Sequence, residues 1–259
     1  MTLLATHGLV RHFGGVKAVD GVDFVLDRGE IRAIIGPNGA GKTTLVGIIC
    51  GRIEPSAGRI RFEERDITGL SAWRRVQRGI AYTFQITSVF AGLTCFDNLA
   101  LAAQRGVHGH RALEKEVARL LGRVGLADSA NSQAGVLPYG HQRLLEVALG
   151  LALKPKLLIL DEPTQGLSDA EIDHFCALIR EVAAEATVLL IEHNMAVVME
   201  LAQRITVMNN GAILAEGTPA EITANAAVQQ AYLGAGCCGS NASTASMATC
   251  RCCATSRSI

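Results

Sequence analysis

The amino-acid sequence predicts an α/β fold in which a mainly parallel sheet is covered by helices on both faces. Short apolar segments typical of buried strands alternate with longer segments whose apolar residues recur every three or four positions. A glycine-rich loop lies between one such strand and the next helix, and a purely helical stretch at about residues 90–150 interrupts the alternation. The chain has 259 residues, 49% of them hydrophobic, so it can bury a large core, either as one domain with an insertion or as two domains.

The individual strands and helices follow from local patterns of apolar residues. Alternating or continuous apolar runs predict strands at residues 5–10, 22–26, 32–35, 58–62, 79–84, 157–160, 187–191, 204–208 and 213–215. Helices are predicted at residues 43–49, 71–78, 96–104, 112–124, 142–153 and 169–185, with one more between residues 191 and 204. Lys154 and Pro155 end a helix just before the run at 157–160, which suits a central parallel strand.

Composition and charge exclude several classes of protein. Lysine plus arginine equals aspartate plus glutamate at 24 each, so no net field attracts nucleic acid, and we expect no nucleic-acid partner. No apolar run approaches the roughly 20 residues that a membrane-spanning helix needs. The first residues lack the basic and apolar regions of a secretory signal, and we therefore expect a cytoplasmic protein.

The cysteines fall into two groups. Cys50, Cys95 and Cys176 lie in apolar surroundings, where we expect buried free thiols. The other five crowd the C-terminal end, at positions 237, 238, 250, 252 and 253. That end has no periodicity and little large apolar surface, so we interpret residues 235–259 as a flexible, cysteine-rich tail. Metal binding and disulfide formation remain alternatives to an adventitious tail, although paired C-x-x-C motifs are missing.

The glycine-rich loop fits the pattern G-x-x-x-x-G-K-[ST] and lies where its mechanism requires, after a strand and before a helix. Its glycines let successive backbone N–H groups turn inward and form a nest for anions. We expect Lys42 to contact the β- and γ-phosphates of ATP, and the Thr43 hydroxyl to ligate Mg²⁺. The residues predicted to hold the phosphates are Gly36, Pro37, Asn38, Gly39, Ala40, Gly41, Lys42, Thr43 and Thr44.

A second candidate site follows the apolar strand at 157–160, where Asp161 and Glu162 stand side by side. The carboxyl ends of strands are where α/β sheets place their ligands. We expect Asp161 to hold Mg²⁺, directly or through water, and Glu162 to orient or deprotonate the attacking water.

Two further polar residues come at strand ends. His193 follows the strand at 187–191 and is expected to contact the γ-phosphate and polarise the site. Gln85 ends the strand at 79–84, where its amide could reach Mg²⁺ or the water. Glu162, His193 and Gln85 are therefore the predicted catalytic residues.

These motifs, together with Leu137 to Gln142 and Leu160 to Thr164, resemble the ATP-binding subunits of ABC transporters over residues 3–234. The resemblance implies a P-loop NTPase (RecA-like) core at about 1–89 and 155–220, with an antiparallel β edge. It also implies an inserted all-helical subdomain at about 90–154, within an ATP-binding domain spanning 1–234.

The resemblance also implies that two subunits pair head to tail and hold each ATP between them. Phe13 would stack on adenine, and Tyr139 and Gly140, in the signature segment, would face the ATP of the partner. Residues 165–168 would form the loop that crosses to the partner site.

Shorter runs are similar to the branch that imports branched-chain amino acids. They are residues 13–15, 137–140, 191–195, 217–219 and 231–234. The branch implies uptake of branched-chain amino acids or a related polar solute, delivered by a binding protein through two permease subunits. It further implies a homodimer or heterodimer of ATP-binding subunits, bound peripherally to the cytoplasmic face of the inner membrane. A permease helix would sit beside Gln85 and residues 90–98.

The signature segment departs from the usual Leu-Ser-Gly-Gly-Gln of the superfamily. Pro138, Tyr139 and His141 replace its Ser, first Gly and Gln, and Ser168 replaces an acid in the crossing loop. Because Gly140 and the following helix can still offer N–H groups, we expect an altered but working half-site. The alternatives are a nucleotide-binding partner with a weak hydrolytic site and a soluble ABC ATPase without a transport role.

Overall fold

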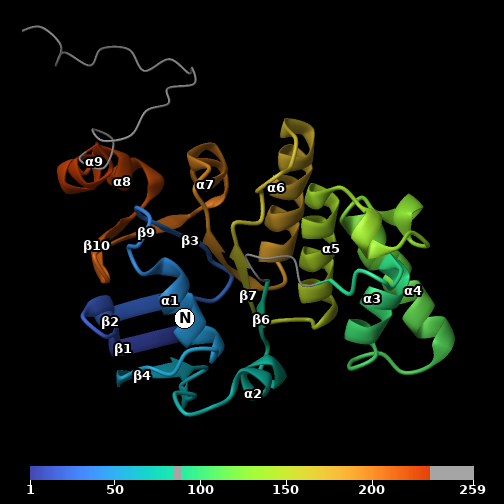
Figure 1. Ribbon diagram of the computed structural model, residues 1–259, viewed down its shortest axis with the longest axis horizontal. Helices are drawn as coiled ribbons and strands as arrows, with labels where there is room; N and C mark the ends of the chain where they lie inside the picture. Colours follow the sequence, from blue (N-terminus) through green and yellow to red (C-terminus); the bar gives the residue numbers. More distant parts are fainter. Residues whose placement is uncertain (84–88, 234–259) are drawn as a thin grey trace, which may run out of the picture.

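The computed structural model describes residues 1–83 and 89–233, in which two sheets and their covering helices form the fold (Figure 1). The strands are β1 (Thr2–Phe13), β2 (Val16–Asp27), β3 (Ile31–Ile35), β4 (Ala57–Phe62), β5 (Arg65–Asp66), β6 (Ile80–Tyr82), β7 (Leu157–Asp161), β8 (Thr187–Ile191), β9 (Arg204–Asn209) and β10 (Ala212–Gly217). The α-helices are α1 (Lys42–Cys50), α2 (Ala72–Gln77), α3 (Cys95–Ala103), α4 (His110–Arg123), α5 (Tyr139–Ala152), α6 (Asp169–Ala183), α7 (Met195–Leu201), α8 (Pro219–Ala224) and α9 (Ala226–Leu233). Two short 3₁₀ turns, at Ala127–Ser129 and Ala134–Val136, lie between α4 and α5.

The larger sheet has the strand order β10-β9-β3-β8-β7-β6. Its strands are parallel except β10, which pairs antiparallel with β9 at the edge. All residues of β3, β7 and β8 are buried, which agrees with their continuous apolar sequences. Because these strands are parallel, the residues that follow their carboxyl ends gather at one edge of the sheet, where the predicted site lies.

The smaller sheet is antiparallel, with the order β2-β1-β4-β5. Helix α1 lies between the two sheets: Leu45 and Ile49 belong to one buried cluster with Ile159 of β7 and with Leu4 and Phe24 of the smaller sheet. This packing holds the helix that carries the phosphate loop against both sheets.

The other face of the larger sheet is covered by α5 and α6, which share a buried cluster with Leu158 and Leu160 of β7. Alternate residues of β7 therefore face opposite layers, as strand geometry requires. Near β9, residues Val198, Ile222 and Val228 of α7, α8 and α9 complete a smaller cluster.

Helices α3, α4 and α5 form the helical insertion between β6 and β7. In Figure 1, α3 and α4 lie at the opposite end of the molecule from β1, β2 and β4. Helix α4 is amphipathic, with Val117, Leu120 and Leu121 buried, and the Thr94 hydroxyl caps α3 by accepting a hydrogen bond from the Asp97 N–H at 3.0 Å.

The predicted α/β fold is confirmed, and most predicted strands and helices agree with the structure to within a few residues; β2 begins at Val16 rather than at Val22, and the short strand β5 was not predicted. The sequence patterns missed α8 and α9, because helices of 6 and 8 residues are too short to show a clear periodicity. A start signal for α8 was nevertheless present, since Thr218 and Glu221 form a capping box and Pro219 occupies the first turn.

In the described residues, no helix is both long and apolar enough to cross a bilayer. Cys50, Cys95 and Cys176 are buried free thiols, as predicted, whereas residues 235–259 lie outside the described residues.

Candidate functional site

The phosphate loop connects β3 to α1 and depends on glycines at two points. Gly36 and Gly41 have φ angles of +152° and +98°. A Cβ atom on Gly36 would collide with the carbonyl oxygen of Met208, and one on Gly41 with that of Ala18. The backbone conformation and the close approach of neighbouring chain therefore both require glycine at these positions.

Lys42 opens helix α1 and is folded over the phosphate loop. Its Nζ donates to the carbonyl oxygens of Gly36 at 2.7 Å and Pro37 at 3.1 Å. Burial lowers the pKa of Lys42, while the carboxylates of Glu162 and Asp161 act in the opposite direction. The ammonium group is thus held at the loop, where phosphate oxygens can replace the two carbonyls.

A pocket of about 330 Å³ lies over this loop. It is lined by residues of the phosphate loop, by the start of α1 and by two predicted catalytic residues, Glu162 and His193. Thr43 and Thr44 also line it, and Thr43 is exposed. The structure therefore brings together predicted residues from three separate parts of the chain.

Asp161, at the end of β7, is 1% exposed, and its two carboxylate oxygens differ in their hydrogen bonding. Oδ2 accepts a hydrogen bond from the Tyr82 hydroxyl at 2.8 Å, whereas Oδ1 has no hydrogen-bond partner among the described residues. Burial raises the pKa of Asp161 above its usual range. A buried carboxylate oxygen without a partner is costly unless a bound cation or water completes it.

Glu162 adopts a left-handed backbone conformation, with φ of +50°, which costs a residue other than glycine roughly 1–2 kcal/mol. Its N–H donates to the carbonyl oxygen of Ile191 at 2.9 Å. Its Oε1 lies 3.0 Å from Nε2 of His193, and both residues face the phosphate pocket. The strained backbone thus directs the carboxylate into the site.

Glu192 is a residue of the site that the sequence analysis missed. Its carboxylate is 4% exposed and accepts four hydrogen bonds. Oε1 accepts from the Thr164 N–H at 3.0 Å and the Thr164 hydroxyl at 2.5 Å, and Oε2 from the N–H groups of His193 at 3.0 Å and Asn194 at 3.2 Å. Glu192 therefore joins the loop after Glu162 to the loop that carries His193. The only signal in the sequence was an acid at the end of an apolar strand.

The signature segment forms the start of α5, with Pro138 at the N-cap position and no side-chain hydrogen bond there. Tyr139 is 43% exposed; its hydroxyl lies 3.4 Å from Oε1 of Gln165, and the Arg143 guanidinium lies 5.4 Å from its ring centroid. None of residues 138–141 is among the described residues that line the phosphate pocket. The exposed start of α5 is thus separate from the phosphate loop of its own subunit.

The crossing loop, residues 165–168, packs against the signature segment. A Cβ atom on Gly140 would lie 2.9 Å from the carbonyl oxygen of Gly166. Ser168 caps α6 in a capping box with Glu171, and Nε2 of His141 lies 3.0 Å from Oε1 of Glu171. Ser168 and His141, two of the four departures from the family pattern, therefore share one acidic partner, Glu171.

Two predicted site residues lie outside this geometry. Phe13 ends β1, is 45% exposed and stacks with the Arg11 guanidinium at 4.7 Å, but it is not among the residues that line the phosphate pocket. It pairs with Val16 across the β1–β2 turn, and Val16 does line the pocket. Gln85 lies outside the described residues. The roles predicted for Phe13 and Gln85 remain predictions.

Comparison with known proteins identifies two family matches. Residues 19–165 match the family described as ABC transporter. Residues 212–237 match the family described as branched-chain amino acid ATP-binding cassette transporter.

Individual relatives match over nearly their whole length. The chain is 39% identical to the high-affinity branched-chain amino acid transport ATP-binding protein BraF of Pseudomonas aeruginosa, over 90% of this chain and 98% of BraF. It is 40% identical to LivG of Salmonella typhimurium, a protein of the same description, over the same shares of the two chains. Among solved structures, the ADP conformation of MJ1267, an ATP-binding cassette of an ABC transporter, matches with a TM-score of 0.82 and 30% identity. That match covers 90% of this chain and 99% of MJ1267.

The family match covers more than half of the chain, and it includes the phosphate loop and the Asp161–Glu162 pair. The relatives agree with it in sequence and in fold. The chain therefore belongs to the ABC transporter ATP-binding family and is the nucleotide-binding ATPase subunit of such a transporter.

Proposed function

We propose that this subunit hydrolyses Mg²⁺-ATP as one half of a head-to-tail pair and powers the uptake of branched-chain amino acids or a related polar solute. The proposed hydrolysis is supported above all by the position of Glu162, which faces the phosphate pocket beside His193. A carboxylate held there can accept a proton from water that attacks the γ-phosphate.

The described side chains divide the work of hydrolysis among them. Lys42 exchanges its two carbonyl partners for phosphate oxygens and offsets their charge. Glu162 orients the water and takes its proton, and His193 contacts the γ-phosphate while holding the Glu162 carboxylate. In this scheme the amide of Gln85 reaches Mg²⁺ or the attacking water, and Phe13 stacks on adenine.

Mg²⁺ fits the residues that the structure places near the phosphate loop. The unpartnered Oδ1 of Asp161 and the exposed hydroxyl of Thr43 are hard oxygen donors. The described residues contain no cluster of three or more His, Cys, Asp or Glu side chains that could hold a metal by themselves. When bound, the ion would neutralise charge on the β- and γ-phosphate oxygens.

A second subunit would complete the ATP site. The start of α5 exposes Tyr139 and lies outside the phosphate pocket of its own chain. Its backbone N–H groups, including that of Gly140, can face the γ-phosphate of ATP bound to a partner. The partner is a second copy or a different ATP-binding subunit. Because Pro138 lacks a hydroxyl, the alternative is a subunit that completes only a weak site.

The transport role follows from the relatives. BraF and LivG are named as transport ATP-binding proteins for branched-chain amino acids. By this similarity, the subunit binds permease subunits at the cytoplasmic face of the inner membrane, and the permease takes its solute from a binding protein. Phe90 is 62% exposed and Leu93 is 37% exposed, so both are available to receive a permease helix.

The substitution Glu162→Gln tests this proposal in the purified transporter complex. The amide keeps the size of the side chain but cannot take the proton. We expect ATP binding within about twofold of the parent, and steady-state hydrolysis lowered by about 10²–10⁴-fold. Parental hydrolysis by Glu162→Gln would show that Glu162 is not the base. Absence of solute-stimulated hydrolysis in the parental complex would contradict the transport role.

A further inference from the structure

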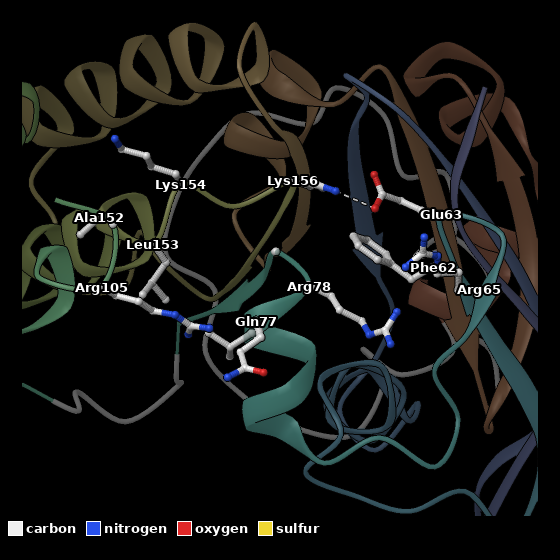
Figure 2. Close-up of a pocket in the computed structure, with 13 residues that line it drawn as sticks. Phe62, Glu63, Arg65, Gln77, Arg78, Arg105, Ala152, Leu153, Lys154 and Lys156 are labelled. Carbon is white, nitrogen blue, oxygen red and sulfur yellow. Dashed lines mark hydrogen bonds and ion pairs between the residues drawn. The ribbon is translucent and has the colours of Figure 1, made fainter. Parts of the chain in front are cut away.

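A second pocket, of about 440 Å³, lies at the opposite edge of the larger sheet from the ATP site. Its lining includes Gly79 and Lys156, which immediately precede β6 and β7, whereas the phosphate loop and Glu162 follow the carboxyl ends of their strands. The remaining walls come from α2, from the turn between β4 and β5, and from the segments that follow α3 and α5 (Figure 2). The pocket therefore joins the core of the fold to the helical insertion.

Cationic side chains dominate this pocket. Five basic residues line it, against one carboxylate, that of Glu63; they are Arg65, Arg78, Arg105, Lys154 and Lys156. Because the whole chain has no net charge, this excess is local. A cluster of this kind attracts anions at short range, although the protein as a whole does not.

The single carboxylate already has its partners. Glu63 accepts a hydrogen bond from Lys156 Nζ at 2.6 Å and another from the Arg28 guanidinium at 2.5 Å. Both contacts hold the pKa of Glu63 below its usual range, so it stays ionised and engaged. Glu63 is consequently not available to the other cations of the pocket.

The other four cations have no ion pair and no side-chain hydrogen bond within the part of the chain that the structure describes. Figure 2 shows the Lys154 ammonium pointing away from the other labelled cations, while the Arg105 side chain extends toward Gln77 of α2. The uncompensated charge inside the pocket is therefore that of three guanidinium groups, those of Arg65, Arg78 and Arg105. Like charges that share a pocket repel one another, and a bound anion would relieve this repulsion.

We propose that this pocket binds a small anion that carries one or two phosphate groups. Guanidinium groups present planar, two-pronged donors that match phosphate oxygens and keep their charge at any physiological pH. The volume falls in the range of small-molecule sites. Arg78 directly follows α2 of the core and Arg105 lies just beyond α3 of the insertion, so an anion that reaches both arginines would connect these two parts.

The phosphate can come from a free anion or from the headgroup of an anionic lipid, and two measurements separate these sources. The first is calorimetric titration of the full chain with inorganic pyrophosphate, after the phosphate loop has been saturated with ADP. The second is sedimentation with vesicles of phosphatidylglycerol and phosphatidylcholine, against vesicles of phosphatidylcholine alone. Saturation with ADP keeps the probe out of the ATP site.

The test variant is the double substitution Arg78→Gln and Arg105→Gln, and the matched control is Arg111→Gln. Arg111 is an exposed arginine of α4 that does not line the pocket. Each lost guanidinium contact should weaken binding about tenfold, so the double variant should bind at least about 50-fold more weakly, and the control within twofold of the parent.

If pyrophosphate binding is weakened by the double substitution but not by Arg111→Gln, the proposal is supported and the source is a free anion. If instead binding to vesicles that contain phosphatidylglycerol is weakened in this way and pyrophosphate does not bind, the proposal is supported and the source is a lipid headgroup. Binding of neither probe, or equal binding by parent and double variant, would overturn it. Unchanged ADP affinity of the double variant would show that the ATP site is intact, so the outcome is independent of the proposed hydrolysis mechanism.

Discussion

Glu192 provides a sharp test of how the two catalytic loops are held together. Its carboxylate accepts two hydrogen bonds from Thr164 and one each from the N–H groups of His193 and Asn194. In Glu192→Gln, the amide oxygen can keep the Thr164 pair, but the NH₂ group then faces two N–H donors. Two hydrogen bonds to a charged group are therefore lost inside a buried site.

Glu192→Gln should lower the stability of the fold as well as the rate of hydrolysis. Hydrogen bonds to a charged group contribute about 1.5–3 kcal/mol each, so the loss of two should lower the free energy of unfolding by roughly 3 kcal/mol or more. For a chain of this size, that corresponds to a fall in Tm of about 6–12 °C. Hydrolysis should fall at least tenfold as well, because His193 loses the anchor of its backbone beside Glu162.

Thermal unfolding followed by circular dichroism measures the first effect, and an ATPase assay of the transporter complex measures the second. The matched control is Thr164→Ser, which keeps both donors to Glu192 and should cost less than about 1 kcal/mol. If Glu192→Gln unfolds at the parental Tm and hydrolyses ATP at the parental rate, Glu192 does not couple the two loops.

Two further substitutions examine the signature segment and the metal site. Pro138→Ser should stabilise α5 by about 1 kcal/mol, since serine is a good N-cap residue. Because it restores a hydroxyl, it should also raise the ATPase rate of the complex several-fold. An unchanged rate would show that Pro138 does not limit the site. Asp161→Asn should abolish most hydrolysis yet raise the Tm of the nucleotide-free protein at neutral pH. Burial raises the pKa of Asp161, so its ionised form destabilises the fold above that pKa, and the gain in Tm should vanish in acid, where the carboxyl is protonated in both states. A lower Tm of Asp161→Asn at neutral pH would contradict this.

The phosphate loop and the Asp161–Glu162 pair were predictable because their chemistry depends on contiguous residues. The motif contains the glycines, the lysine and the threonine together, and the apolar strand before Asp161 identifies its place at the sheet edge. Strand positions were predictable for the same reason, since β3, β7 and β8 are continuous apolar runs.

Tyr82 and Glu192 could not be predicted, because their contacts join distant parts of the chain. The bond from Tyr82 to Asp161 depends on β6 lying beside β7, with Tyr82 in register with Ile159. The contacts of Glu192 with Thr164 span 28 positions. Strand order and register arise from tertiary packing, which local patterns do not contain. The pocket lined by Arg65, Arg78 and Arg105 could not be predicted for the same reason, because these arginines come from three separate segments.

In the arrangement that we propose, ATP is held between the phosphate loop of one subunit and the start of α5 in another. The most direct measurement is sedimentation of Glu162→Gln with Mg²⁺-ATP, beside the double variant Glu162→Gln and Pro138→Asp. Aspartate is a favourable N-cap residue, so α5 should remain intact, while its charge would repel the partner's γ-phosphate.

We predict that Glu162→Gln associates with a second copy, or with a different ATP-binding subunit supplied with it, only when Mg²⁺-ATP is present. The double variant should bind ATP but stay monomeric. Association of the double variant to the same extent, or an ATP-bound Glu162→Gln that remains monomeric with either partner, would contradict the claim that two subunits share each ATP.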